Sequence, residues 1–197
     1  MTVEKPILFS APMVRAILGD KKTMTRRVAK LNSAGRGRLR GRNWRYDDPD
    51  ATCACPYGRP GDLLWVREAW RTLPIYDARK PTDLATNTAI QYAAYGAAVN
   101  GPAPADGWGR LRPGMFMPRW ASRINLEITW VGVERLQDIS ERDAIAEGAP
   151  ESITKYGMTS RYKYRRESFV ELWDDINFAR APWAGNPWVW VVEFKRL

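Results

Sequence analysis

Histidine is absent from the 197-residue sequence, so the side chain most often used for acid-base catalysis is missing. Ser-His-Asp and Cys-His catalysis are therefore excluded, as is any zinc site that needs imidazole. Only two cysteines are present, Cys53 and Cys55, and a four-cysteine zinc site would need a second pair. We expect them to be two reduced thiols in a surface loop rather than a strained local disulfide. No metal site and no cofactor is predicted.

Long apolar runs are also lacking. No stretch approaches the roughly eighteen apolar residues of a membrane helix, and the first residues do not form a positive region followed by a long apolar core. The sequence therefore predicts a cytoplasmic protein with no membrane partner. Hydrophobic residues make up 45% of the chain and charged residues 27%, which is typical of a globular protein. At this length we expect one elaborated domain over residues 1–197, acting as a monomer.

Positive charge is concentrated in one part of the chain. Between Arg15 and Arg45, eleven Lys or Arg residues accompany a single acidic residue, Asp20, so this segment carries +10 while the whole chain carries +9. The rest of the chain is therefore close to neutral. Charge this localised favours a polyanionic partner, and RNA or single-stranded nucleic acid is the first candidate. A solvated basic loop that only aids solubility is the alternative that charge alone leaves open.

The apolar pattern predicts an α+β protein with short helices between separated strands. Helices are expected at 11–18, 141–147 and 167–176, and strands at 63–70, 124–136 and 188–194. Residues 75–109, rich in Ala, Pro, Gly and Asp, are interpreted as an insertion with one strand near 90–95, and residues 31–56 as a basic loop. Because no glycine-rich phosphate loop is present, a small mixed β-barrel or closed sheet is predicted rather than a doubly wound nucleotide fold.

Several segments together resemble a known family. These are ILGDKKTMTRR (17–27), CPYGRPGDLLWVREAW (55–70), MPRWASRI (117–124), DISERDAIAEG (138–148) and NPWVWVVEF (186–194). They resemble the ASCH domain of the PUA-like superfamily, in a subgroup common in bacteriophages and prophages. Asp20 stands where this subgroup usually has glycine. The resemblance covers most of the chain outside the insertion and the basic loop, and it implies a PUA-like small mixed β-barrel with short helices.

The resemblance also implies a catalytic set. A bacterial amidohydrolase of this family acts on N4-acetylcytidine, and its catalytic residues fall on Lys22, Thr25 and Glu147. We expect the cations around Lys22 to lower its pKa, so that a neutral amine activates the Thr25 hydroxyl while Glu147 orients the amine or shuttles a proton. Arg26 or backbone amides would stabilise the oxyanion. The same three residues also fit plainer roles: a phosphate contact, a strand residue and a solvated helix end.

Basic and aromatic residues outside this set are candidates for nucleic acid contacts. Trp70 and Trp120 are expected to be exposed and to stack on an unpaired base, with core packing as the alternative. Arg67 has a structural alternative, an ion pair with Glu68. The stretch 36–45 is expected to be a flexible electrostatic arm. The predicted nucleic-acid-binding residues are Lys21, Arg26, Arg27, Arg36, Arg38, Arg40, Arg42, Arg67, Trp70, Arg119 and Trp120.

Three functions stay open at this point. The first is hydrolysis of an N-acyl group on a cytosine-type base, carried as a modified nucleoside or within single-stranded nucleic acid. The second is a non-catalytic module that binds RNA or another single strand in a basic cleft. The third is a ribonuclease that uses the same cleft, with lysine and arginine supplying the charge. The first and second differ in salt dependence, because binding through several phosphates weakens steeply as salt rises.

Overall fold

The computed structural model describes residues 2–31, 35–39, 42–47, 51–96, 98–99, 101, 104–105, 107–155, 158–161 and 164–197. The helices in these ranges are α1 (Ala11–Leu18), α2 (Glu141–Ala146) and α3 (Arg165–Asn177). The strands are β1 (Glu4–Leu8), β2 (Met24–Val28), β3 (Arg36–Leu39), β4 (Arg42–Arg45), β5 (Leu63–Arg67), β6 (Trp70–Thr72), β7 (Ile90–Tyr92), β8 (Ala98–Val99), β9 (Asn125–Arg135), β10 (Ser152–Lys155), β11 (Met158–Arg161) and β12 (Trp188–Arg196).

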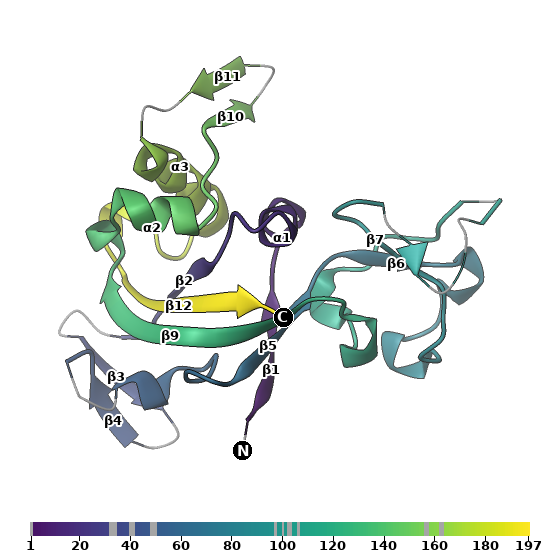
Figure 1. Cartoon of the computed structure of the whole chain (residues 1–197), viewed down its shortest axis with the longest axis horizontal. Coiled ribbons are helices and arrows are strands. Elements are labelled where there is room, and N and C mark those ends of the chain that lie inside the picture. The colour runs from purple at the N-terminus through teal and green to yellow at the C-terminus, as the bar shows by residue number, and fades with distance from the viewer. Residues whose placement is uncertain are drawn as a thin grey trace.

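Five strands form the main sheet, in the order β1-β5-β9-β12-β2 (Figure 1). Strand β1 runs parallel to β5, and the other neighbouring pairs are antiparallel, so the sheet is mixed. The predicted α+β class is confirmed. In the described part of the chain β1 pairs only with β5 and β2 only with β12, so strand pairing leaves this sheet open. Strand β2 is therefore an edge strand.

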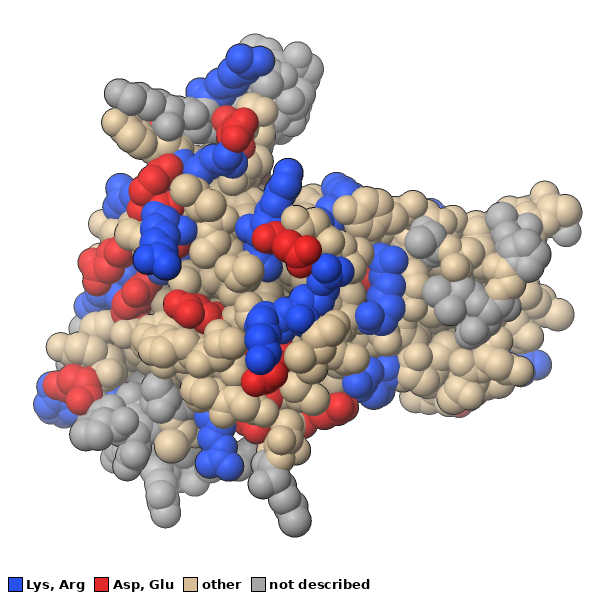
Figure 2. All heavy atoms as spheres, viewed as in Figure 1, with Lys and Arg blue, Asp and Glu red and all other residues tan. Residues whose placement is uncertain are grey.

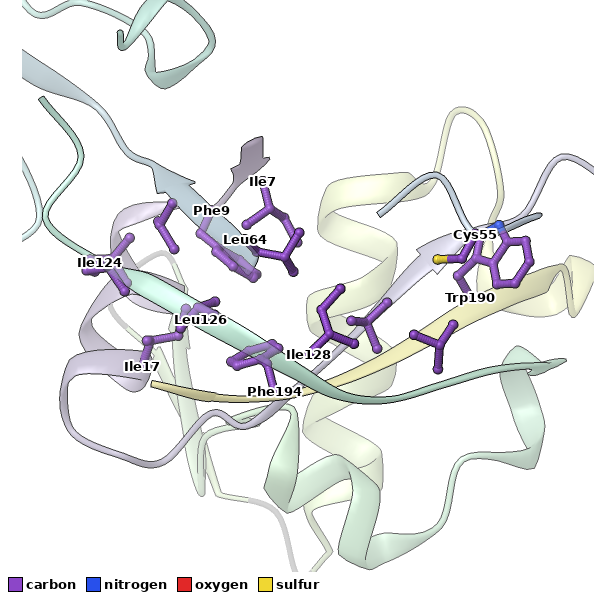
Figure 3. Packing of buried hydrophobic residues seen from close by; sticks show 14 of the residues in the cluster. Ile7, Phe9, Ile17, Cys55, Leu64, Ile124, Leu126, Ile128, Trp190 and Phe194 are labelled. Atoms are coloured by element: carbon purple, nitrogen blue, oxygen red, sulfur yellow. The ribbon is translucent and has the colours of Figure 1, made fainter. Parts of the chain in front are cut away.

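Strand β12 is buried on both faces because its apolar residues do not alternate with polar ones. Side chains point to opposite faces at successive strand positions. Trp190, Val192 and Phe194 join the first core, and Val189 and Val191 join the second. Figure 3 shows the first core, where Trp190 and Phe194 lie with side chains from β1, β5 and β9. The predicted interior strand is confirmed.

Helix α1 packs on the first core, whereas α2 and α3 cover the second core. Ser140 caps α2, accepting from the Asp143 N–H while the Asp143 carboxylate accepts from the Ser140 N–H. This capping box satisfies two otherwise unpaired donors at the helix start. In α3, Phe169 and Trp173 are buried as predicted, but Ile176 is 55% exposed. The predicted apolar stripe therefore leaves the core before the helix ends.

The turn after α1 has a backbone conformation that few residues adopt. Asp20 has a φ of 55°, in the left-handed region, immediately after the helix C-cap Gly19. Asp tolerates this region better than most non-glycine residues. The position therefore needs the conformation that glycine, usual in the subgroup that this sequence resembles, adopts without strain.

The predicted insertion is part of a separate lobe that lies beside the main sheet, away from α2 and α3 (Figure 1). The predicted strand at 63–70 divides into β5 and β6, and β6 leads the chain out of the main sheet into this lobe. There β6, β7 and β8 form a three-stranded sheet rather than the single strand expected. A third core, with Trp70, Ile90 and Tyr92 at its centre, stabilises the lobe.

The predicted basic loop contains a β-hairpin. Strands β3 and β4 pair in antiparallel register, which places Arg36 opposite Arg45. Tyr46 then stacks on Trp188 of the main sheet, with ring centroids 4.3 Å apart. The described part of this segment is thus paired and held against the main sheet by stacking, unlike the flexible arm expected. Arg40 lies outside the described residues.

The two cysteines are both free thiols, but they occupy different environments. Cys53 is exposed, as expected for a surface loop. Cys55 is 4% exposed and belongs to the first core, so the expectation of a surface thiol is wrong at this position. Burial raises the pKa of the Cys55 thiol. Among the described helices, none combines the length and apolarity needed to span a bilayer.

Candidate functional site

A small cavity of about 70 Å³ lies against the edge strand β2, between α1, the end of α2 and α3. Lys22, Thr25 and Glu147, the three residues that the family resemblance implies as catalytic, all line it. The structure thus brings together residues that are more than 120 positions apart in the chain. The remaining lining residues are Met13, Arg26, Arg27, Val28, Phe169, Leu172, Trp173, Ile176 and Asn177.

Backbone contacts hold Lys22 and Glu147 in place. After the turn at Asp20, the Lys22 N–H donates to the carbonyl of Ala16 in α1. The next residue, Thr23, donates to the carbonyl of Ala146 at 2.8 Å, which ties the start of β2 to the end of α2. Glu147 is the C-cap of α2 and so directly follows this contact. The turn after α1 and the C-terminal end of α2 therefore position Lys22 and Glu147.

Lys22 and Glu147 form a buried ion pair. The Lys22 Nζ donates to Glu147 Oε2 at 2.6 Å and to the Glu147 carbonyl oxygen at 2.8 Å. Exposure is 2% for Lys22 and 7% for Glu147. The Nζ also lies 5.7 Å from the centroid of the Phe9 ring. A solvated helix end is therefore the wrong description of Glu147.

Burial lowers the pKa of Lys22, because the ammonium loses its hydration while the neutral amine loses much less. The Glu147 carboxylate opposes this shift, and Arg27 and Arg26 add to it with smaller effects. The predicted direction is confirmed. The neighbouring cations, which were the predicted cause, contribute less to the lowered pKa than desolvation does.

Arg26 is enclosed by acidic residues. Its side chain is 1% exposed, and its guanidinium lies 2.5 Å from Glu134 Oε1 and 3.0 Å from Asp143 Oδ2. Glu147 Oε1 lies 3.5 Å away, so the glutamate of the Lys22 pair belongs to the same network. The charge of Arg26 is thus already paired inside the protein, which does not favour the predicted contact with nucleic acid.

Arg27 is the lining cation whose charge is not matched by a carboxylate at contact distance in the described structure. Its Nη2 donates to the carbonyl of Leu8 at 2.6 Å, and its Cζ lies 5.1 Å from the centroid of the Phe9 ring. The Nε is buried and has no hydrogen-bond partner among the described residues. Burial lowers the pKa of Arg27, yet a guanidinium stays charged in proteins. Arg27 shares a face of β2 with Thr25 and not with Arg26.

The predicted aromatic stacking residues lie in the lobe and not at this cavity. Trp70 is completely buried, so the expectation of an exposed stacking surface is wrong. Trp120 is partly buried and meets the Trp70 ring edge to face, at 6.4 Å between centroids. Both residues therefore contribute to packing of the third core.

Two predicted phosphate ligands also have protein partners. Arg67 lies over the Trp65 ring at 4.6 Å, and Arg119 pairs with Glu4 at 3.0 Å. Glu68 does not pair with Arg67 as the alternative proposed, because its carboxylate binds Arg123 at 2.9 Å. Neither Arg67 nor Arg119 lines the cavity at β2.

The remaining basic residues do not gather around the cavity either. Lys21 is exposed and lines a separate groove of about 770 Å³ with Arg142 and Arg165. Arg36, Arg38 and Arg42 belong to the hairpin. On the face drawn in Figure 2, basic residues over the sheet and α2 are interleaved with acidic ones rather than gathered in a single patch.

Sequence reasoning assigned Phe169 and Trp173 to the core and missed that they also line the cavity. No pattern in the sequence separates these two roles, because a cavity lining and a core face have the same helical spacing. The described residues contain no group of three His, Cys, Asp or Glu side chains placed to hold a metal ion.

Comparison with known proteins gives little further information. No family model matches the chain, and no curated protein matches it. A solved structure, that of protein EF3133 from Enterococcus faecalis V583 with the family description DUF984, aligns with a TM-score of 0.44 at 9% identity. The alignment covers 100% of this chain and 82% of the other. A similarity this weak carries no argument about function, and the ASCH resemblance stays a prediction.

Proposed function

We propose that this chain is an ASCH-type protein of the PUA-like class that hydrolyses an N-acyl group on a cytosine-type base held in the cavity beside β2. The base is carried by a modified nucleoside or by single-stranded nucleic acid. The observation that carries the proposal is the buried Lys22–Glu147 pair, at 2.6 Å, in a cavity that Thr25 also lines. Buried ionisable groups with perturbed pKa values are concentrated at functional sites.

Lys22 and Glu147 act as the proton-transfer pair. Burial lowers the pKa of Lys22, which favours the neutral amine that a general base requires. The amine accepts a proton from the nucleophile, either the Thr25 hydroxyl or a water molecule, as its oxygen bonds to the acyl carbon. The same proton passes to the amide nitrogen as the carbon–nitrogen bond breaks. With one water consumed, the products are the carboxylic acid and the free amine of the base.

Arg27 is the cation suited to the negative oxygen of the tetrahedral intermediate. Its buried Nε has no partner among the described residues, whereas Arg26 is held by Glu134 and Asp143. A donor without an existing partner is free to bind charge that develops during the reaction. This assignment replaces Arg26, the residue suggested by sequence.

The cavity must widen to admit a base. Its volume of about 70 Å³ is well below the roughly 300–1,000 Å³ of typical small-molecule sites. Helix α3 contributes Leu172, Ile176 and Asn177 to the lining, and Ile176 is already 55% exposed. Because these side chains belong to α3 and not to β2, their movement would widen the cavity on the side opposite Thr25's strand.

The test is incubation with N4-acetylcytidine, followed by mass detection of cytidine. We expect Lys22→Met and Glu147→Gln to lower the rate by roughly 100-fold or more, since general acid-base catalysis contributes about that much. The nearly isosteric Thr25→Val separates the two nucleophiles: a large loss indicates attack by Thr25, and a small loss indicates attack by water.

Lys195→Met is the matched control, because Lys195 also pairs with a glutamate, Glu127, at 3.0 Å but is exposed. It should retain the wild-type rate. Absence of cytidine with the wild-type protein, or equal rates for Lys22→Met and Lys195→Met, would refute the hydrolase.

A non-catalytic nucleic-acid-binding module is the second candidate, and the β3–β4 hairpin favours it. Its two strands carry Arg36, Arg38, Arg42 and Arg45, a local concentration of positive charge that favours a polyanion, although Arg45 also pairs with Asp47 at 2.9 Å. For this function, log K for a single strand should fall with log salt by roughly 0.7 per phosphate contact. Hydrolysis of an uncharged nucleoside should be nearly insensitive to salt.

A further inference from the structure

A second cavity, of about 390 Å³, lies on the insertion lobe between residues 78–81 and 110–116. Its volume falls within the roughly 300–1,000 Å³ typical of small-molecule sites. Four of its lining residues are cations, and it shares no residue with the cavity beside β2. The cations are Arg79, Lys80, Arg110 and Arg112.

Arg112 is a buried cation that contacts no carboxylate among the residues that the structure describes. It is 4% exposed, and its guanidinium donates to the carbonyls of Arg79 at 3.1 Å and Tyr76 at 2.5 Å. Its buried Nε has no hydrogen-bond partner among the described residues. Carbonyl groups satisfy donors but carry no net charge, and the Trp70 ring lies 5.6 Å from the Arg112 Cζ, so the guanidinium is only partly compensated, by the ring and by the more distant Asp77 carboxylate. A buried charge of this kind is costly unless an opposite charge approaches.

The other three cations are exposed, and Arg79 lies 5.4 Å from the centroid of the Tyr76 ring. In the described part of the chain, no carboxylate lies within ion-pair distance of Arg79, Lys80 or Arg110. Asp77, the acidic residue at this loop, instead accepts the backbone N–H of Arg110 with both carboxylate oxygens, at 3.0 Å. The cavity therefore carries a net positive charge, which favours an anionic ligand.

Apolar groups form the rest of the cavity lining. Phe116 is 56% exposed and Leu111 is 51% exposed, and two prolines, Pro81 and Pro113, lie with them. Large apolar side chains exposed around a positive cavity suit a ligand with both a flat ring and an anionic group. A nucleotide has this combination, since its phosphate binds guanidinium groups and its base stacks on aromatic rings.

We propose that this cavity binds one nucleotide, with the phosphate at Arg79 and Arg110 and the base against Phe116. The nucleotide is either free or one unit of a single strand. The proposal does not depend on hydrolysis beside β2, because the two cavities have no lining residue in common.

Equilibrium binding of adenosine 5′-monophosphate, measured by calorimetry, tests the proposal. Arg79→Ala/Arg110→Ala should weaken binding at least about tenfold, because it removes two charge-assisted phosphate contacts. The matched control is Arg59→Ala/Arg180→Ala, which removes two exposed arginines elsewhere and should change affinity less than about twofold. Phe116→Ala, at an exposed position, should weaken binding of the nucleotide but not of inorganic phosphate.

A single-stranded oligonucleotide distinguishes the two sources. If the double substitution weakens its binding as strongly as that of the mononucleotide, the site holds one unit of a strand; if only mononucleotide binding falls, the ligand is free. Glu147→Gln should leave mononucleotide binding unchanged, so loss of hydrolysis and loss of this site are separable. No saturable binding of the mononucleotide, or equal affinity in the double variant and its control, overturns the proposal.

Discussion

The cations beside β2 and the cations of the insertion lobe differ in their partners, although both groups include a buried residue. Lys22 and Arg26 are surrounded by Glu134, Asp143 and Glu147, all within 3.5 Å. Arg112 contacts two carbonyls and lies 5.6 Å from the centroid of the Trp70 ring, and Arg79 and Arg110 have no ion-pair partner among the described residues. Lys22 and Arg26 are therefore neutralised inside the protein, whereas Arg27 beside β2 and the cations of the lobe have no carboxylate at contact distance among the described residues.

Local density of positive charge in the sequence does not indicate which cations lack a carboxylate partner in the folded chain. The segment with the highest density of positive charge is 15–45. Two of its cations, Lys22 and Arg26, pair with carboxylates that come from residues 134–147. The lobe has a lower density, yet folding gathers its cations around one cavity. Pairing across the fold, and not charge in the chain, decides which cations remain available.

The largest expected effect comes from breaking the paired group. Glu147→Ala leaves Lys22 buried without its carboxylate, and loss of one partner of a buried pair costs about 3–5 kcal/mol of unfolding free energy. Urea unfolding measures this loss. Glu167→Ala, at an exposed position in the first turn of α3, is the control and should cost less than about 1 kcal/mol.

The double variant Lys22→Met/Glu147→Leu sharpens this comparison. Removing both charges and keeping similar volume is often neutral or stabilising, so the double variant should recover most of the stability lost in Glu147→Ala. If Glu147→Ala is no more harmful than Glu167→Ala, the Lys22–Glu147 pair is not the tightly buried contact described above.

A smaller effect is expected from pH. The pKa of Lys22 in the folded protein is lowered from its ordinary value of 10.5. Between the lowered pKa and 10.5, the unfolded chain therefore binds more protons than the folded one. The unfolding free energy therefore rises with pH across this interval and loses that contribution as pH falls through the lowered pKa. Urea unfolding of the wild type and of Lys22→Met should be compared across alkaline pH. The unfolding free energy of the wild type should increase relative to that of Lys22→Met as pH rises. A difference in unfolding free energy that does not change with pH would contradict a lowered pKa for Lys22.

Much of the fold follows from local signals. The helix start at Ser140 and the apolar run of 188–194 predict an α+β protein in which this last strand is interior, as observed. The burial of Trp70 and Cys55 was not predictable, because each depends on which distant segments cover it. The three-stranded lobe was missed for the same reason, since β6 lies outside the segment interpreted as the insertion.

The candidate site was predictable only in part. The resemblance indicated Lys22, Thr25 and Glu147, and these do line one cavity. The sequence could not show that desolvation is the main cause of the lowered Lys22 pKa, since burial is a property of the folded chain. It also could not separate Arg26 from Arg27, because their difference depends on carboxylates more than 100 residues away.

The most direct test of this contrast between paired and unpaired cations is a titration with inorganic phosphate, followed by amide NMR chemical shifts. Saturable shifts should appear around Arg79, Arg110 and Arg112, where no carboxylate neutralises the cations. Shifts at Lys22 and Arg26 should be smaller than those in the lobe, because their charges are already paired, and Arg27 is the cation beside β2 at which a weak response is expected. Shifts at Lys22 and Arg26 with none in the lobe would contradict the account.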